Sequence, residues 1–266
     1  MQMKELERLV EVVARLRDKK NGCPWDSVQT NMSIRRYLVE EAGEYLDALE
    51  DGDDYAVRDE LGDLLLQVVL NAQIAKDEGR FDLEDVARSE ADKMVRRHPH
   101  VFGTSDARTD DELLRQWERI KHTEKGYSER KSALDGVPRS VPGLLRAQKT
   151  ASKAMKAGFS WPGPAEALAK VEEELDEVKS AMAAGDGAPL EEELGDLLFA
   201  IAVLCQHKGI QAEEAMHGAI RKFSERFRRM ESQLEEDGAG PLAQCGPDTL
   251  AKAWRQAKAE ERHGGK

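Results

Sequence analysis

The sequence has few aromatic residues, few cysteines and no surplus of positive charge. Aromatic side chains make up 5% of its 266 residues and charged ones 35%, a balance typical of soluble helical proteins. The formal net charge of −12 argues against a nucleic-acid groove, because phosphate backbones are bound by basic surfaces. An acidic protein can still bind a phosphate ligand when metal ions lie between the two negative partners.

Disulfide and membrane signals are also absent. Cys23, Cys205 and Cys245 form no C-x-x-C pair, and their odd number argues against a disulfide framework, so we expect free thiols. The charged, amphipathic first residues do not resemble a signal peptide. The longest apolar run, Leu197 to Cys205, is far shorter than the roughly 20 residues of a membrane-spanning helix. We therefore expect a cytoplasmic protein that binds neither membranes nor nucleic acids.

What the sequence does contain is one acidic pattern written twice. Glu-Glu-x-x-Glu is followed by Glu-x-x-Asp, and both recur 133 residues later with no gap between them. Blocks around Trp25, Lys93 and Trp117 also have counterparts around Trp161, Lys222 and Trp254, at slightly different spacings. Such a repeat predicts two copies of one module whose loops differ in length. The acidic positions are Glu40, Glu41, Glu44, Glu60 and Asp63 in the first copy, and Glu173, Glu174, Glu177, Glu193 and Asp196 in the second.

The modules are predicted to be entirely helical. Periodicity predicts helices over residues 33–50, with Ser33 as the cap, 55–78, and 82–97, with Asp82 as the cap. The second copy repeats two of them, one ending near residue 184 and one ending at Lys208. No segment alternates like a strand, and short breaks between long helices favour antiparallel neighbours. We expect an all-α chain of tandem helical-bundle modules: residues 3–125, a linker over 126–141 and residues 142–262.

The paired helices bring acidic residues toward one another. Residues three or four apart share a helix face, so four carboxylates of each copy can surround one point. The helices that carry Asp63 and Asp196 are apolar nearly all round, so we expect them to be interior. A carboxylate buried there needs a partner, and an all-oxygen ligand set selects Mg²⁺ first and Mn²⁺ second. For the other helix of each pair, a merely solvated acidic face remains an alternative.

The duplicated pattern and its flanking blocks resemble the MazG family of nucleoside triphosphate pyrophosphohydrolases over nearly the whole chain. The resemblance implies hydrolysis of NTPs and dNTPs to the monophosphate and pyrophosphate, in the all-α NTP pyrophosphatase fold and as a homodimer. It also implies that the C-terminal copy is the chief active one. The metal ligands it implies are Glu174, Glu177, Glu193 and Asp196, with Glu41, Glu44, Glu60 and Asp63 as their N-terminal counterparts.

Further residues are candidates for the nucleotide and the water. Glu173 and Glu174 are the candidate catalytic residues, and Glu173 is free to orient or deprotonate a metal-activated water that attacks the α-phosphorus. The alternative for the basic candidates is an ordinary surface ion pair, and the alternative for Trp254 is an indole that only packs. We interpret Trp25 and Trp161 as packing residues. The candidate nucleotide contacts are Lys170, Glu173, Lys222, Arg226, Trp254 and Lys258.

Two other functions remain open. A di-iron carboxylate bundle needs Glu-x-x-His on two helices, and Glu214 with His217 fits that spacing without a counterpart in the first copy. A non-catalytic regulatory or interaction protein with vestigial metal sites is the other alternative. Intact acidic residues in both copies argue against it.

Overall fold

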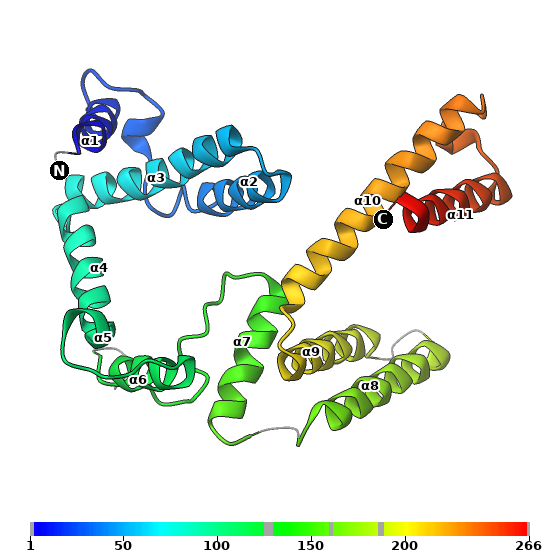
Figure 1. Ribbon diagram of the computed structural model, residues 1–266. Coiled ribbons are helices and arrows are strands. Elements are labelled where there is room, and N and C mark those ends of the chain that lie inside the picture. The colour runs from blue at the N-terminus through cyan, green and yellow to red at the C-terminus, as the bar shows by residue number, and fades with distance from the viewer. Residues whose placement is uncertain (1–2, 125–129, 160–161, 186–188, 265–266) are drawn as a thin grey trace. The chain divides into compact units, whose positions relative to one another are not determined.

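The structure is a computed structural model, and it describes residues 3–124, 130–159, 162–185 and 189–264, without side chains beyond 260. Every regular element in these ranges is a helix, so the predicted all-α fold is confirmed (Figure 1). The predicted packing of Trp161 and most of the break at 185–187 lie outside the described residues.

The chain forms two compact units, Met1–Ser128 and Glu129–Lys266. Among the described residues, each unit contains a packing helix and then a helical hairpin, followed by three further α-helices in the first unit and two in the second. The first unit contains α1 (Lys4–Leu16), η1 (Asp26–Val28), α2 (Tyr37–Asp51), α3 (Asp54–Asp77), α4 (Leu83–Arg97), α5 (Pro99–Phe102) and α6 (Asp110–His122). The second contains α7 (Gly143–Lys156), α8 (Pro164–Ala184), α9 (Leu190–Lys208), α10 (Ala212–Glu236), η2 (Leu242–Gln244) and α11 (Pro247–Gly264).

A tight helical hairpin is the centre of each unit. In the first, Gly52 ends α2 in the left-handed region, with a φ of 72°, and the Asp53 side chain then caps α3 by accepting from the Tyr55 backbone N–H. In the second, α8 and α9 pack along each other in the same way. The acidic pattern of each copy therefore lies on two adjacent helices, which α1 and α7 support by packing on α3 and α9.

Local signals predicted one helix start correctly and another wrongly. Asp82 caps α4 through a capping box with Asp85, as expected. Ser33 does not cap α2, which begins at Tyr37 without a side-chain cap. Its hydroxyl is already used in a turn, where it accepts from the Thr30 N–H at 2.9 Å and donates to Gln29 Oε1 at 2.6 Å. This turn places Ile34, which is fully buried, in the core.

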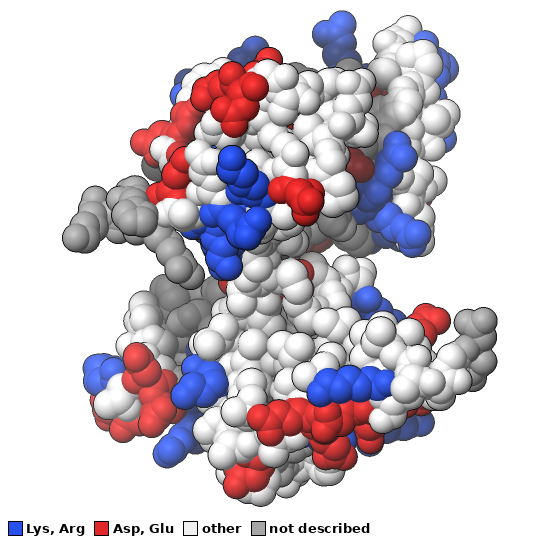
Figure 2. All heavy atoms as spheres, turned by 90° about the vertical axis from the view of Figure 1, so that its right-hand side faces the viewer, with Lys and Arg blue, Asp and Glu red and all other residues white. Residues whose placement is uncertain are grey.

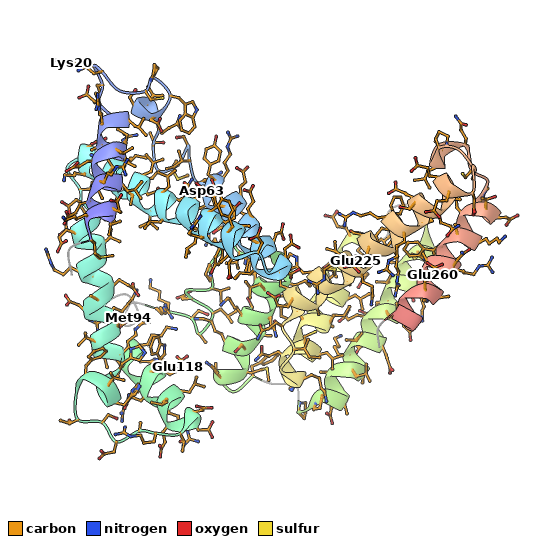
Figure 3. All side chains as sticks on the ribbon, turned by 45° about the horizontal axis from the view of Figure 1, so that its top comes forward. Lys20, Asp63, Met94, Glu118, Glu225 and Glu260 are labelled. Carbon is orange, nitrogen blue, oxygen red and sulfur yellow. The ribbon has the colours of Figure 1, made fainter. Side chains whose placement is uncertain are left out.

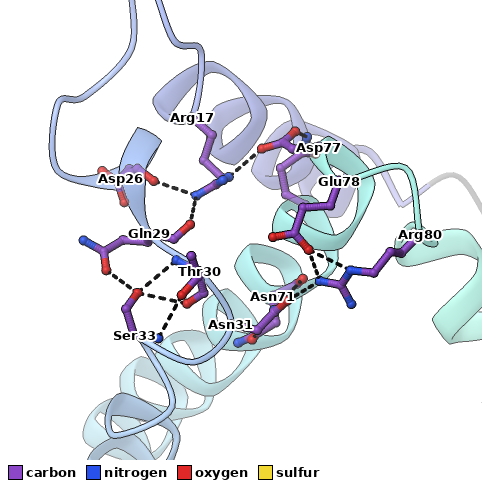
Figure 4. A network of polar contacts seen from close by, with 11 residues as sticks. Arg17, Asp26, Gln29, Thr30, Asn31, Ser33, Asn71, Asp77, Glu78 and Arg80 are labelled. Carbon is purple, nitrogen blue, oxygen red and sulfur yellow. Dashed lines mark hydrogen bonds and ion pairs between the residues drawn. The ribbon is translucent and has the colours of Figure 1, made fainter.

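A polar clamp fixes the segment between α1 and α2 against the end of α3 (Figure 4). Arg17 is 7% exposed, and its Nε lies 2.7 Å from the Asp77 carboxylate. The same guanidinium donates to the backbone oxygens of Asp26 and Gln29, at 2.6 and 3.2 Å. Asn31 donates to the side chain of Asn71 on α3 at 2.7 Å. The loop that carries Trp25 is therefore held by α1 and α3.

Three small cores hold the helices together. One contains Val13, Ile34, Val69, Leu70 and Ile74 and joins α1 to α3. Another joins α7, α8 and α9. The third joins α10 to α11, which lies alongside the far part of α10 (Figure 1).

The helices that carry Asp63 and Asp196 are not interior, contrary to expectation. Leu61, Leu65 and Val68 are exposed on α3, and Leu194, Leu198 and Ile201 are exposed on α9. These residues sit at the same positions of the repeat, so both copies leave one apolar stripe uncovered. The expectation failed because the other helices of each unit cover only part of the surface of α3 and α9, so an apolar composition on all sides did not mean burial on all sides.

The surface charge agrees with the acidic composition. On the face drawn in Figure 2, basic side chains are interspersed with acidic ones and with wide uncharged areas, and they form no continuous basic tract. Among the described helices, none is long and apolar enough to cross a bilayer.

Candidate metal and nucleotide site

Three carboxylates of the first copy converge between α2 and α3. One oxygen each from Glu41, Glu44 and Glu60 lies within 4.8 Å of the others. Glu41 and Glu44 are one turn apart on α2, and Glu60 faces them from α3. The Glu60 Oε2 atom is buried and has no hydrogen-bond partner among the described residues. A buried anionic oxygen without a donor is costly unless a cation satisfies it.

The second copy repeats this arrangement. Oxygens of Glu174, Glu177 and Glu193 also lie within 4.8 Å of one another, on α8 and α9. Glu174 is 6% exposed, and its Oε2 is buried without a partner among the described residues. Both clusters therefore combine three close carboxylates with one unsatisfied buried oxygen.

The fourth predicted ligand of each set lies beside its cluster. Asp63 and Asp196 are not among the groups whose oxygens converge within 4.8 Å. Asp63 is half-buried on the stretch of α3 that runs beside α2 (Figure 3), and Asp196 is exposed. The structure therefore brings three of the four predicted ligands together in each copy.

The pKa values in the first cluster show mutual repulsion. Burial is the largest cause that raises the pKa of Glu41, followed by the charges of Asp63 and Glu44. The pKa of Glu60 is raised by desolvation and then by Glu44 and Asp63. Neither pKa is lowered by a lysine or arginine among the described residues. The first cluster thus concentrates negative charge with no protein counter-ion, which favours a bound cation.

Lys170 distinguishes the second cluster. Its Nζ lies 2.7 Å from Glu174 and 2.9 Å from Glu173, so the ion-pair alternative describes this lysine. Lys170 is the first cause that lowers the pKa of Glu174, and Glu174 in turn raises the pKa of Glu177. Glu173 is mostly exposed and is not part of the converging group. The position of Lys170 is occupied by Tyr37 in the first copy.

The other candidate nucleotide contacts lie on α10 and α11. Lys222 and Lys258 are exposed, and Trp254 is half-buried against Phe223, with ring centroids 5.2 Å apart. Within the described residues, α11 packs on α10 and makes no extensive contact with α8 or α9. The structure therefore does not bring Trp254 or Lys258 of α11 onto the Glu174 cluster, and Lys222 lies on α10. Trp254 contributes to the α10–α11 core, in line with the packing alternative.

Their N-terminal counterparts are engaged elsewhere. Arg97 donates to both oxygens of Glu124, and its guanidinium lies over the Trp117 ring, 5.0 Å from the centroid. Lys93 pairs with Glu90 on its own helix. The contacts of Arg97 join α4 to α6 and to Glu124 just after it, so Arg97 has a structural role in the first copy, whereas the ion pair of Lys93 stays within α4.

Sequence reasoning missed a pocket beside the first cluster. It has a volume of about 270 Å³, and Glu41 belongs both to its wall and to the carboxylate cluster. Gln67, one of its polar residues, is 5% exposed and donates from Nε2 to Glu41 Oε1 at 3.5 Å. The only sequence signal was a polar residue inside an apolar helix. The pocket is lined by Val13, Leu16, Trp25, Asp26, Tyr37, Glu41, Leu66, Gln67 and Leu70.

The donor atoms fit a hard divalent cation. All converging groups are carboxylates, and oxygen-only sites suit Mg²⁺, Ca²⁺ or Mn²⁺. Within the described part of the chain, no group of three close potential ligands includes a histidine, and Glu214 and His217 belong to neither cluster. The di-iron alternative therefore has no support in the geometry.

Comparisons with known proteins agree with this geometry. The sequence pattern of the MazG nucleotide pyrophosphohydrolase domain matches residues 29–102 and 163–230, which include both hairpins. The nucleoside triphosphate pyrophosphohydrolase of Escherichia coli (strain K12) is 46% identical over 97% of this chain and 99% of its own length. The Thermotoga maritima nucleoside triphosphate pyrophosphohydrolase/pyrophosphatase MazG is 42% identical over 95% of each chain. The nucleoside triphosphate pyrophosphohydrolase of Mycobacterium tuberculosis is 43% identical over 58% of this chain and 46% of its own length.

Two acidic helical hairpins on an all-α scaffold define a class of helical nucleotide hydrolases that act through carboxylate-bound metal. The chain belongs to the MazG nucleotide pyrophosphohydrolase family.

Proposed function

We propose that this chain hydrolyses nucleoside triphosphates, NTPs and dNTPs, to the monophosphate and pyrophosphate. The observation that carries the proposal is the convergence of three carboxylates within 4.8 Å in each copy, each cluster with an unsatisfied buried oxygen. The two relatives that match along their full length are named for this activity, which supports the same substrate class.

The proposed cofactor is Mg²⁺, with Mn²⁺ as a substitute. The ligands would be Glu174, Glu177 and Glu193, joined by Asp196, and their counterparts Glu41, Glu44, Glu60 and Asp63. When bound, the ion supplies charge neutralisation for the phosphates and lowers the pKa of a coordinated water. Asp196 would join the set by a change of rotamer on the exposed face of α9.

The residues around the second cluster have distinct proposed roles. Lys170 neutralises Glu174 in the resting protein and can turn to a phosphate oxygen once a cation takes over that role. Glu173 would then lose its contact with Lys170, and its exposed carboxylate could orient the attacking water and accept its proton. Glu174, as a ligand, fixes the position at which this happens. Family analogy supports the C-terminal copy as the chief active one.

A second copy of the chain would complete the site. We propose a homodimer in which the exposed stripe of Leu194, Leu198 and Ile201 is buried by its partner. A nucleotide held by the other subunit could then be contacted by Lys222, Arg226, Trp254 and Lys258.

We further propose that the protein acts on free nucleotides in the cytoplasm, in keeping with its acidic charge and three free cysteines.

The test is hydrolysis of a panel of NTPs and dNTPs with Mg²⁺, with products identified by phosphorus NMR. We expect monophosphate and pyrophosphate in equal amounts. Reaction in ¹⁸O-labelled water should place the label in the monophosphate, because attack at the α-phosphorus breaks the α–β bond. Release of inorganic phosphate and a diphosphate would refute the proposed chemistry.

Paired substitutions then identify the working copy. Glu193→Gln with Asp196→Asn should lower kcat/KM by more than about a hundredfold. Even the loss of a residue that only hydrogen-bonds to a metal ligand lowers metal affinity or activity by about 10–100-fold. Glu60→Gln with Asp63→Asn is the matched change in the other copy and should retain most of the turnover. The reverse result would assign turnover to the N-terminal copy, and no effect from either pair would refute metal-assisted hydrolysis at these clusters.

A further inference from the structure

The pocket beside the first cluster has the size and lining of a small-molecule subsite. Its volume of about 270 Å³ lies just below the range of roughly 300–1,000 Å³ that is usual for whole drug-sized ligands. Most of the wall is apolar, and polar groups enter from Glu41, Gln67 and Asp26. Such a cavity suits one flat, uncharged ring system with hydrogen-bonding edges, while the remainder of the ligand stays outside.

Two aromatic rings offer stacking surfaces for such a ring. Trp25 and Tyr37 lie edge to face, with ring centroids 6.1 Å apart. Trp25 is 49% exposed although a buried arginine clamp holds its loop, so its indole is fixed but not covered by the protein. A half-exposed, rigidly supported indole at a pocket differs from the packing residue that the sequence suggested.

Gln67, in the wall of the pocket, has an unsatisfied buried polar atom. Its side chain is 5% exposed, and its Oε1 atom accepts no hydrogen bond from the described residues. Its Nε2 makes only the long 3.5 Å contact with Glu41. A buried carboxamide costs free energy unless its hydrogen bonds are made, and its paired donor and acceptor match the edge of a nucleobase.

Glu41 connects this pocket to the carboxylate cluster. It lines the cavity and also lies within 4.8 Å of Glu44 and Glu60. A ligand whose ring fills the pocket would therefore have its other end near the proposed metal ions. A nucleotide has this distribution of chemistry, with a flat base at one end and phosphates at the other.

The equivalent positions of the second copy are chemically different. At the repeat offset of 133, Ala200 replaces Gln67, Lys170 replaces Tyr37 and Phe199 replaces Leu66. The described residues there line a space of about 60 Å³, and its wall includes the ion pair of Lys170 with Glu174 on α8. The second copy thus has no carboxamide at the position where the first copy has one.

We infer that the N-terminal module binds the base of a nucleotide in the Trp25–Tyr37–Gln67 pocket, and that Gln67 gives this module a base preference that the C-terminal copy lacks. The inference rests on the proposed function, because it places the phosphates at the N-terminal carboxylates. The ligand class is a nucleoside triphosphate bound with its metal. The two copies therefore differ in which nucleotides they recognise.

The experiment isolates the first site within the full-length chain. Glu177→Gln with Glu193→Gln removes ligands from the second cluster and gives the parent protein. Calorimetry then measures its binding of α,β-methylene analogues of ATP, GTP, CTP and UTP in Mg²⁺. Gln67→Met keeps the size of the side chain and removes its polar atoms. Gln73→Met makes the same change on α3 outside the pocket and serves as the matched control.

The parent should bind the four analogues with dissociation constants that differ by about tenfold or more, as expected for one good pair of hydrogen bonds to a base. Gln67→Met should reduce this spread to within about threefold, and Gln73→Met should preserve it. Trp25→Ala should raise the dissociation constants of all four analogues by about tenfold, because stacking on an aromatic ring depends little on which base is bound. This last substitution is at a half-exposed position, so it remains informative if Gln67→Met fails to fold.

Two results would overturn the inference. If the analogues bind but neither Gln67→Met nor Trp25→Ala changes any affinity, the base lies outside this pocket, and the proposed hydrolysis is unaffected. If the parent binds no analogue in Mg²⁺, the N-terminal module has no nucleotide site. Pyrophosphate release by the unsubstituted chain then decides separately whether the proposed function holds.

Discussion

At the scale of single residues, Lys170 accounts for the main electrostatic difference between the two clusters. Its ammonium lies 2.7 Å from Glu174, where the first copy has the uncharged Tyr37. A cation that enters the second cluster must therefore displace a protein charge. The same lysine, once displaced, is placed to meet a phosphate. One side chain thus opposes metal binding and favours substrate binding.

Lys170→Met should separate these two effects. With Glu41→Ala and Glu60→Ala disabling the first cluster, Mn²⁺ affinity at the second should rise by about tenfold, because a positive charge within 4 Å is worth about 1–4 kcal/mol. With the first cluster intact, kcat/KM for NTPs should fall. Electron paramagnetic resonance gives the free Mn²⁺ concentration, and pyrophosphate release gives the rate.

Lys179→Met is the control for this change. Lys179 pairs with Asp176 on the same helix, away from the cluster, and its side chain is 63% exposed. Lys179→Met should alter neither the Mn²⁺ affinity of the second cluster nor kcat/KM for NTPs. Unchanged or weaker Mn²⁺ binding in Lys170→Met would contradict the view of Lys170 as an internal counter-ion.

A second prediction at this scale concerns Glu124 and the pH dependence of the protein's stability. Arg97 and Arg96 lower its pKa to about 2, whereas an unfolded glutamate titrates near about 4.3. The stabilisation is therefore complete above about pH 4.3 and is lost as the pH falls toward about 2. Glu124→Gln should destabilise the protein by about 1–2 kcal/mol at pH 7 and by about half as much at pH 3, because a carboxyl group with a pKa of about 2 is still largely ionised in the folded protein at that pH.

Urea unfolding at the two pH values measures this difference. Glu5→Gln removes a carboxylate whose side chain is 83% exposed and should have almost no effect at either pH. An equal loss of stability at pH 7 and pH 3 for Glu124→Gln would show that its charge is irrelevant.

At the scale of elements, the Arg17 clamp sets the path of the chain between α1 and α2. Arg17→Met should destabilise the first unit by about 2–4 kcal/mol, because it leaves Asp77 without its cation and removes the hydrogen bonds that Arg17 donates to two backbone oxygens. Arg8→Met, an exposed ion pair on the same helix, should cost less than about 1 kcal/mol. Denaturant unfolding measures the loss in free energy of unfolding for both variants. Similar losses would show that the Arg17 contacts contribute no more than an exposed ion pair.

The clamp also shows why some helix bounds were predictable and others were not. The sequence predicted helices over 55–78 and 82–97, and the structure has Asp54–Asp77 and Leu83–Arg97. Their ends depend on local signals such as the Asp82 capping box. The start of α2 instead depends on contacts from Arg17 and Asn71, which lie far away in sequence. No local pattern around Ser33 encodes those contacts.

The same distinction applies to the site. Carboxylates at helical spacing on neighbouring helices were predictable, and three of each four converge. The pocket was not predictable, because Trp25, Tyr37 and Gln67 come from a loop and two helices that meet only in the folded unit. Whether Lys222, Trp254 and Lys258 bind a nucleotide stays a prediction.

At the scale of the whole molecule, the uncovered apolar stripes are the observation on which the proposed homodimer rests. Leu61, Leu65 and Val68 on α3 recur as Leu194, Leu198 and Ile201 on α9, and all six are exposed. Each set follows an i, i+4, i+7 spacing, which places it on one face of its helix. A stripe kept in both copies is what the proposed homodimer predicts, with modules paired most simply across a two-fold axis.

We therefore expect the 29.7 kDa chain to sediment as a dimer of about twice that mass. Leu65→Glu with Leu198→Glu should give monomers, because a two-fold interface contains each substituted position twice and burying one leucine is worth about 1.5–3 kcal/mol. Val101→Glu changes another exposed apolar residue, outside both stripes, and should leave the mass unchanged. If the double variant stays dimeric, another surface joins the subunits. If it is monomeric yet hydrolyses NTPs at the full rate, the residues of α10 and α11 are not needed from a partner, and one chain alone forms a complete site.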